Sequence, residues 1–337
     1  MAKSKKRKQK ERNFRLFYLL ILLLITALSL SVSSYAWFTT NRLARVDLLN
    51  VNVRAQGGIE VSTDGINFKG AINVNDIESA RDTYPTSLNQ IPKTLEPVST
   101  IGSVSNGLMN IFYGKVENNL NGDYILSSQR NIEKEGFDEN SDGKFISFDL
   151  FFKTSENTRL YLTPESDITY AGSYSVGIEN AMRVAFVYEG NTFTGNSSAN
   201  IQSMITNNSN DVYIWEPNYN KHTQSAIANA KNTYGITINE DSSFVPYDGV
   251  KNEISANLNI KASNAKASNY PSLFEKVNIA YYTKTDFTEN VEIFSLNKGI
   301  TKIRVYMWIE GQDVDCENDA SGSKVSYNIQ LSMDNGA

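Results

Sequence analysis

Acidic and amide side chains are concentrated in one short segment whose spacing is suited to a metal ion. Residues 138–143 read DENSDG, the calcium-loop pattern that supplies oxygen ligands at positions 1, 3 and 5 and a glycine for the sharp turn. Position 12 is an Asp, shorter than the usual Glu, and a strand pattern follows instead of a helix. The candidate calcium ligands are Asp138, Asn140, Asp142 and Asp149. The alternative is a plain turn, because Asp, Asn and Gly favour turns unaided.

A second group of acids surrounds the only cysteine. Asp313, Asp315, Glu317 and Asp319 lie on both sides of Cys316. Alternating carboxylates can bind a hard cation, but they are also typical of a solvated loop. Their negative charge disfavours a nucleophilic thiolate, so we expect Cys316 to be a small buried hydrophobe or a free surface thiol.

Enzymatic motifs are absent from the sequence. One His and one Cys cannot form a Cys/His zinc site, an intrachain disulfide or an iron-sulfur cluster. The sequence contains no His-Glu-x-x-His, no Gly-x-Ser-x-Gly and no phosphate-binding P-loop. We therefore expect no enzyme activity and no cofactor apart from the candidate calcium. Trp215 and Trp308 are candidate sugar-stacking side chains, with core packing as the alternative.

Charge is distributed unevenly along the 337 residues. The chain has 32 Lys and Arg against 37 Asp and Glu, but residues 1–36 carry eight basic groups and one acid. Residues 37–337 therefore have a net charge of −12. A body of this charge repels phosphates, so we expect no nucleic-acid partner.

The basic head is followed by an apolar run typical of an export signal. Residues 16–32 read LFYLLILLLITALSLSV, and residues 16–38 are long enough to cross a membrane as a helix. Ser34 and Ala36 supply the small residues that a signal peptidase requires before a cut between Ala36 and Trp37. The alternative is an uncleaved signal anchor. In both cases positive-inside orientation places the body outside the cytoplasmic membrane.

Residues 33–39, SSYAWFT, resemble the signal segment of TasA-like and camelysin-like surface proteins of low-GC Gram-positive bacteria. The resemblance covers about the first 40 residues. It implies a secreted β-sandwich that self-associates into biofilm-matrix fibres, with the new N-terminus inserted as a donor strand into a neighbouring sheet edge. The apolar side chains of that assembly strand would be Trp37, Phe38, Val46, Leu48, Val51 and Val53.

The body has a strand-rich pattern with few helical periods. Apolar residues alternate with polar ones over 325–333, and similar alternation covers 303–309, 258–260 and 184–188. Residues 144–153 and 159–162 are expected to form a strand pair, and 59–68 contains an Asp64-Gly65 hairpin signal. Two short helices are expected, at 199–205 and 223–232. Many short strands with 39 Asn and only 7 Pro favour an all-β, antiparallel sandwich of jelly-roll type with long loops.

The predicted organisation is a signal segment at 1–36, an N-terminal strand segment at 37–56 and a sandwich at 57–337. Two sandwiches meeting near 190–250 are the alternative, and residues 76–107 are expected to form a long surface excursion. We expect a secreted or cell-surface structural protein that self-assembles as a matrix or fibre subunit. A membrane-anchored, calcium-dependent adhesive or carbohydrate-binding module is the alternative function.

Overall fold

The computed structural model describes most of the chain between Val46 and Met333. The described residues are 46–56, 59–118, 124–133, 142–170, 177–231, 236–238, 244–261, 264–316 and 323–333. The chain divides into two compact units, Met1–Tyr35 and Ala36–Ala337, and every described residue belongs to the second. The account below concerns that second unit.

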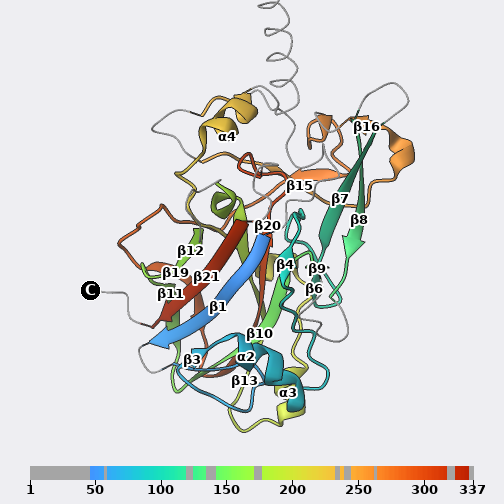
Figure 1. Ribbon diagram of the computed structural model, residues 1–337. Coiled ribbons are helices and arrows are strands. Elements are labelled where there is room, and N and C mark those ends of the chain that lie inside the picture. Colours follow the sequence, from blue (N-terminus) through green and yellow to red (C-terminus); the bar gives the residue numbers. More distant parts are fainter. Residues whose placement is uncertain are drawn as a thin grey trace, which may run out of the picture. The chain divides into compact units, whose positions relative to one another are not determined.

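A mixed eight-stranded sheet, sheet A, brings the first and last described strands together. Its strands are β1 (Val46–Gln56), β3 (Ala71–Ile72), β4 (Thr94–Leu95), β9 (Asp142–Gly143), β11 (Thr158–Leu162), β12 (Asp167–Tyr170), β19 (Val291–Leu296) and β21 (Ser323–Ser332). The order is β19-β11-β21-β1-β4-β9, with β12 also pairing β21 and β3 also pairing β1. Strands β1 and β21 run parallel, and Figure 1 shows them as neighbouring blue and dark red arrows.

A six-stranded sheet, sheet B, forms the second layer. Its strands are β2 (Glu60–Ser62), β10 (Ile146–Thr154), β13 (Met182–Thr192), β14 (Val212–Glu216), β18 (Tyr281–Tyr282) and β20 (Gly299–Ile309). The order is β18-β14-β13-β20-β10-β2, and all pairs are antiparallel except β14 with β18. The central strand β20 is paired along nearly its whole length on both sides.

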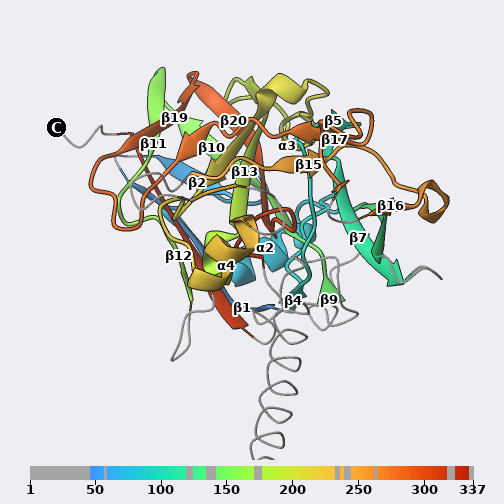
Figure 2. The ribbon, with the colours of Figure 1, turned by 90° about the horizontal axis from the view of Figure 1, so that it is seen from above.

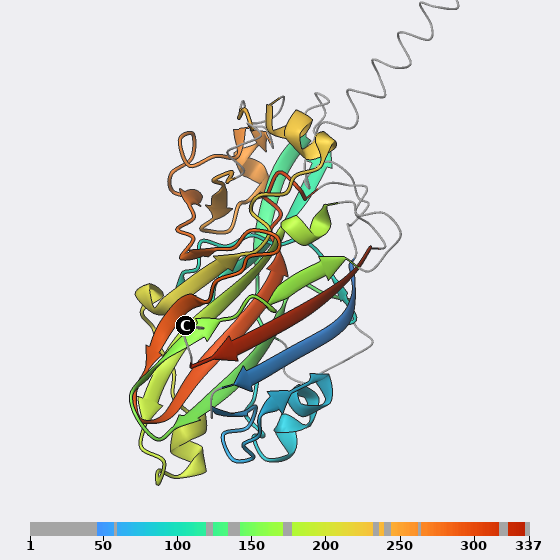
Figure 3. The ribbon, with the colours of Figure 1, turned by 90° about the vertical axis from the view of Figure 1, so that its left-hand side faces the viewer.

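Side chains from both sheets form one apolar core. Val53, Leu160 and Ile329 of sheet A lie in the same buried cluster as Phe148 and Val305 of sheet B. Because side chains alternate across a strand, each sheet presents every second residue to this core. The two sheets therefore pack face to face, and Figure 3 shows β1 and β21 beside the long strands of sheet B. The predicted β-rich class is confirmed.

The opposite face of sheet B is covered as well. Tyr306, Trp308 and Ile214 of this face pack against Val98 and Met109 in a second buried cluster. Consequently all eleven residues of β20 are buried. The strand predicted at 303–309 is present, but its outer side chains do not meet solvent as an alternating pattern suggests.

The segment 76–107, predicted as a surface excursion, is part of this cover. Tyr84 and Val98 of this segment are at most 5% exposed and pack in the clusters outside sheet B, and the segment also includes β5 (Val104–Ser105). Ile91 and Leu95 of β4 are buried in the core between the sheets, so the prediction was wrong. The Pro, Ser and Thr residues of this segment indicate irregular backbone and do not indicate that the segment is exposed.

Smaller elements surround the two sheets. The remaining strands are β6 (Leu108–Met109), β7 (Ile111–Asn118), β8 (Tyr124–Asn131), β15 (Asp248–Val250), β16 (Ile260–Lys261) and β17 (Phe274–Lys276). The α-helices are α2 (Val74–Ser79), α3 (Ser198–Gln202) and α4 (Gln224–Asn229), and the 3-10 helices are Ala80–Asp82, Ile178–Asn180, Ser209–Asp211 and Ala256–Leu258. Figure 2 shows β7 and β16 on the opposite side of this unit from β11 and β19.

Both predicted helices are present in shortened form as α3 and α4, and Thr223 caps α4 by accepting from the backbone N–H of Ala226 at 3.0 Å. The strand predicted at 258–260 is confirmed only at its end. Leu258 is the last residue of a 3-10 helix and is 54% exposed, and Asn259, which ends this helix, adopts a left-handed conformation with φ 51°.

Residues 144–153 and 159–162 do form strands, but they do not pair. Strand β10 pairs with β20 and β2 in sheet B, whereas β11 pairs with β19 and β21 in sheet A. The short link between them is a corner between sheets, held by the Thr154 hydroxyl, which donates to the carbonyl of Asn297 at 3.1 Å. The Asp64-Gly65 turn is confirmed, with Gly65 at φ 72°.

Candidate functional site

The predicted assembly strand lies in the sheet of its own chain. Strand β1 contains four of the six predicted positions, residues 46, 48, 51 and 53. Val53 has no exposed surface and contributes to the core between the sheets. Trp37, Phe38 and the predicted cleavage position Ala36 lie outside the described residues.

Pairing holds β1 unequally on its two sides. On one side it follows β21 in parallel register from Val46 with Ser323 to Gln56 with Ser332, with one irregularity near residue 49. On the other side β4 pairs only with residues 46–47 and β3 only with 53–54. Among the described strands, residues 48 and 50–52 therefore have a register partner on the β21 side alone.

The structure separates the two ends of the candidate calcium loop. Asp142 opens β9 in sheet A, whereas Asp149 lies inside β10 of sheet B. Asp138 and Asn140 lie outside the described residues. The loop is thus the passage between two sheets, and its twelfth position is the interior of a strand.

Asp149 is the anionic centre of a buried network on the outer face of sheet B. Its carboxylate is 1% exposed and accepts hydrogen bonds from Arg304 Nη1 at 2.9 Å and from the Tyr84 hydroxyl at 3.0 Å. Lys302 Nζ lies 3.4 Å from the same carboxylate and donates to the carbonyl of Met204 at 3.0 Å. Burial opposes ionisation, but the two cations keep the pKa of Asp149 below its usual range. Arg304 and Lys302 thus supply the countercharge of Asp149.

A second buried charge network lies along β13, β14 and the segment after β20. Arg183 has no exposed surface, lies 3.1 Å from Glu216 Oε1 and also contacts Asp313. Its guanidinium donates to the carbonyl of Met182 at 2.8 Å and lies over the ring of Tyr247. Arg183 therefore joins three parts of the chain that are distant in sequence.

The only histidine belongs to this second network. His222 Nδ1 lies 2.6 Å from Asp315 Oδ2, and the backbone N–H of Asp315 donates to Asp313 at 2.8 Å. Glu310 accepts from the indole N–H of Trp308 at 3.0 Å and from the backbone N–H of Gln312 at 3.1 Å.

Carboxylates outnumber cations in this network, and the pKa values of several of these carboxyl groups are raised. Burial raises the pKa of Glu216 and of Glu310 to about 7, although Arg183 opposes the shift at both. Burial also raises the pKa of Asp315 to about 6, against the hydrogen bond from His222. Protons on these carboxyls therefore compensate the excess negative charge near neutral pH.

The acids around Cys316 are thus not a solvated loop where the structure describes them. Asp313 and Asp315 are 5% and 1% exposed, and Cys316 is buried in the core, as one of the two interpretations predicted. Glu317 and Asp319 lie outside the described residues. Arg183, which pairs with Asp313, was not identified from the sequence. The available signal was that Arg183 is a charged residue within an apolar strand pattern.

Trp215 and Trp308 have no exposed surface. Trp215 donates to the hydroxyl of Thr283 at 2.8 Å, and Trp308 packs in the cluster outside sheet B. Neither ring is accessible to a sugar, so the core-packing interpretation is confirmed.

The described surface contains a polar cleft of about 620 Å³. Strand β12, the loop 217–223 after β14 and the loop 283–287 after β18 line it. His222 and Thr223 are in its wall, and Asp315 behind them accepts from the Thr223 backbone N–H at 3.3 Å. The cleft is therefore adjacent to the second charge network.

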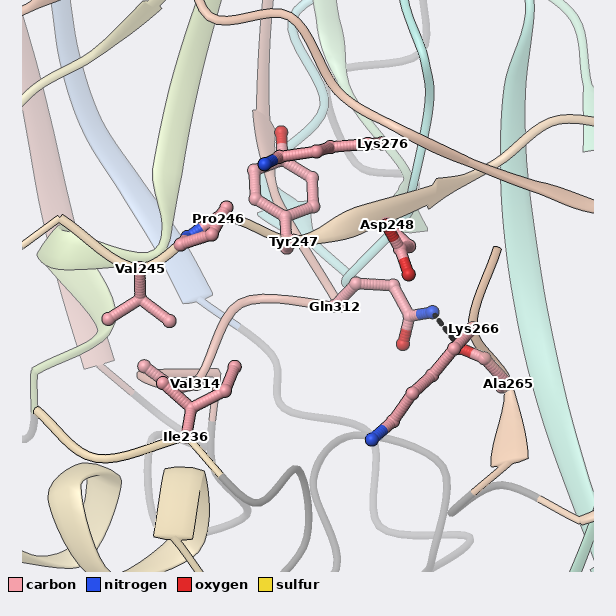
Figure 4. A pocket seen from close by; sticks show the side chains of 10 residues that line it. All are labelled: Ile236, Val245, Pro246, Tyr247, Asp248, Ala265, Lys266, Lys276, Gln312 and Val314. Atoms are coloured by element: carbon pink, nitrogen blue, oxygen red, sulfur yellow. Dashed lines mark hydrogen bonds between the residues drawn. The ribbon is translucent and has the colours of Figure 1, made fainter. Parts of the chain in front are cut away.

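A smaller cavity of about 260 Å³ lies on another side of the same network. Figure 4 shows Val245, Val314 and Ile236 gathered on one side and Gln312 and Lys266 on the other. The Gln312 amide donates to the carbonyl of Ala265 at 3.3 Å, which fixes the polar side.

Within the described ranges, no group of three or more His, Cys, Asp and Glu side chains is arranged to hold a metal ion. In the same part of the chain no helix is both long and apolar enough to span a bilayer; residues 16–38 lie outside it. Comparison with family models, curated proteins and solved structures found no match for this chain.

Proposed function

We propose that this chain is an exported, cell-surface structural protein whose copies self-assemble by exchanging β1. The observation that carries the proposal is the position of β1, which forms ten parallel register pairs with β21 and, on its opposite edge, pairs with the described strands only at residues 46–47 and 53–54. A strand that completes its own sheet fits the same slot in a second copy, because the register and the core contact of Val53 are identical.

Export is supported by the N-terminal sequence. The basic head followed by residues 16–38 matches the requirements of an export signal, and residues 33–39 resemble the TasA-like segment. A signal peptidase that cuts before Trp37 would place nine residues ahead of β1. In this proposal the body is a sandwich, but not a purely antiparallel jelly roll, because β1 and β21 are parallel.

The test locks β1 into its own sheet. Asn52 and Asn328 are register partners on β1 and β21, and both are partly exposed. Cysteines at both positions, in a Cys316→Ala background and a chain beginning at Trp37, form a reducible cross-link. We expect filaments by negative-stain electron microscopy from the reduced protein and none from the oxidised protein.

The single variant Asn52→Cys in the same background is the control, and it should polymerise with or without reductant. Filaments from the intramolecularly cross-linked protein would overturn β1 exchange. Monomers under every condition would overturn self-assembly altogether.

The alternative function, a calcium-dependent adhesive or carbohydrate-binding module, has less support from the described residues first assigned to it. Both tryptophans are buried, and Asp149 is bound to Arg304 and Lys302, whereas Asp138 and Asn140 lie outside the described residues. A binding function therefore needs another surface, which is considered next.

A further inference from the structure

The loops that form the walls of the polar cleft are held in a defined conformation. Asn218 and Asp286 both line it in the left-handed conformation, with φ 56° and 57°. This conformation is uncommon outside glycine and recurs at binding sites. The Asn218 amide donates to the carbonyl of Ile168 at 3.2 Å, and Asn220 accepts from the backbone N–H of Thr285 at 2.7 Å. These bonds hold the loops 217–223 and 283–287 in place.

The charged side chains of the cleft favour some ligands over others. Among the Asp, Glu and Lys residues that line the cleft, carboxylates outnumber ammonium groups. They are Glu165, Asp167, Glu179, Asp286, Lys221 and Lys284. This balance disfavours phosphate, sulfate and other anionic ligands. Carboxylates accept hydrogen bonds and ammonium groups donate them, so a ligand that does both, such as a sugar hydroxyl, matches the mixture.

Aromatic rings accompany these polar groups. Tyr170 and Phe287 line the cleft and are half-buried. Rings in the wall of a polar cleft can stack on the C–H faces of sugar rings, so these two side chains add an apolar contact to the polar lining.

We propose that this cleft binds an oligosaccharide of neutral or amino sugars. The inference goes beyond self-assembly through β1, since it involves different elements and needs no polymer. A matrix subunit with this cleft attaches to a polysaccharide as well as to its own copies.

The test is isothermal titration calorimetry of the full chain, purified in a detergent without a sugar headgroup so that the detergent does not compete. The probes are the hexamers of N-acetylglucosamine and of glucosamine. We expect at least one to bind at a single site with Kd below about 1 mM.

Two variants locate the site. Asp286→Asn removes one charge while keeping a residue that tolerates the left-handed conformation, and Phe287→Leu replaces a ring of the cleft wall by an aliphatic side chain. Each should weaken binding at least tenfold, about 1.4 kcal/mol, in a protein that still unfolds cooperatively. Glu156→Gln, an exposed carboxylate outside the cleft, should bind as the unaltered protein does.

Three results would overturn the inference. They are no heat from either hexamer at about 5 mM ligand, unchanged affinity in both cleft variants, and equal weakening by Glu156→Gln, which would reveal general charge attraction. Filament formation is scored separately, so failure of sugar binding leaves the exchange of β1 as a distinct question.

Discussion

Arg304 of β20 and Asp149 of β10 are register partners, and their side chains meet at 2.9 Å with at most 4% of either residue exposed. The pair links the central strand of sheet B to its neighbour on the face that the segment 76–107 covers. The Tyr84 hydroxyl of that segment contacts the same carboxylate at 3.0 Å. The buried ion pair therefore fastens the cover to the sheet.

Removing the negative charge of Asp149 should lower the stability of the protein. Asp149→Asn leaves Arg304 and Lys302 buried without a countercharge, so we expect a loss of about 3 to 5 kcal/mol in the free energy of unfolding. Urea denaturation followed by tryptophan fluorescence measures it. Glu60→Gln breaks an ion pair with Lys153 whose side chains are 51% and 41% exposed, and should cost less than about 1 kcal/mol. Equal losses in the two variants would contradict the assignment.

Stability should fall as pH rises through neutrality. Burial raises the pKa of Glu310 and Glu216 to about 7 and of Asp315 to about 6, so the folded state binds protons that the unfolded state has released. This stabilisation is complete below the unfolded pKa and is lost as pH passes the folded value. For Glu310 alone the change between pH 5 and 8 is about 2 to 3 kcal/mol.

Urea titrations at several pH values measure this slope, and Glu310→Gln should flatten it. Asp64, whose pKa is lowered to about 2 by hydrogen bonds from Ser62 and Thr83 despite burial, contributes only at more acidic pH. A stability that rises from pH 5 to 8 would show that these carboxyls are not held protonated.

Gly299 should not tolerate a side chain. It has φ 127°, and a Cβ atom there would lie 2.1 Å from the Thr192 carbonyl oxygen on the adjacent strand β13. We expect Gly299→Ala to lower the free energy of unfolding by more than about 2 kcal/mol. Gly70→Ala, where a Cβ meets nothing within 4 Å, is the matched control and should change it by less than about 0.5 kcal/mol. Similar melting temperatures for both would contradict this backbone geometry.

Strand β1 should bind to the rest of the protein when it is supplied as a separate peptide. A version beginning at Gly57 lacks the parallel partner of β21 and the core side chain of Val53. We expect it to be less stable and to bind a synthetic peptide of residues 37–56, with fluorescence polarisation of the labelled peptide as the measurement. The peptide carrying Val53→Asp is the control and should bind at least tenfold more weakly, since it buries a charge. Equal binding of both peptides would exclude the slot.

Strands could be predicted from the sequence far better than their partners. The alternation through Val325, Tyr327 and Ile329 marks β21 because its outer face stays partly exposed. In β20 the polar residues Lys302 and Arg304 suggest a solvent face, yet both are buried under segments from elsewhere in the chain. Local patterns report that residues alternate, but not what covers them.

The two buried charge networks could not be predicted from local sequence patterns for the same reason. Arg183 and Asp313 are 130 residues apart, and Asp149 and Arg304 are 155 apart. Each pair forms only once antiparallel strands bring distant segments together. The acidic run near Cys316 was visible in the sequence, but its burial depends on an arginine that no spacing rule connects to it.

The parallel course of β1 and β21 also determines how the molecule would carry tension. Because the two strands point the same way, the chain enters β1 at one end of the pair and leaves β21 at the other. A pull on these two ends loads the hydrogen bonds between the strands in shear, so they must break together instead of unzipping one by one. The ten register pairs, about 33 Å long, thus form a mechanical clamp.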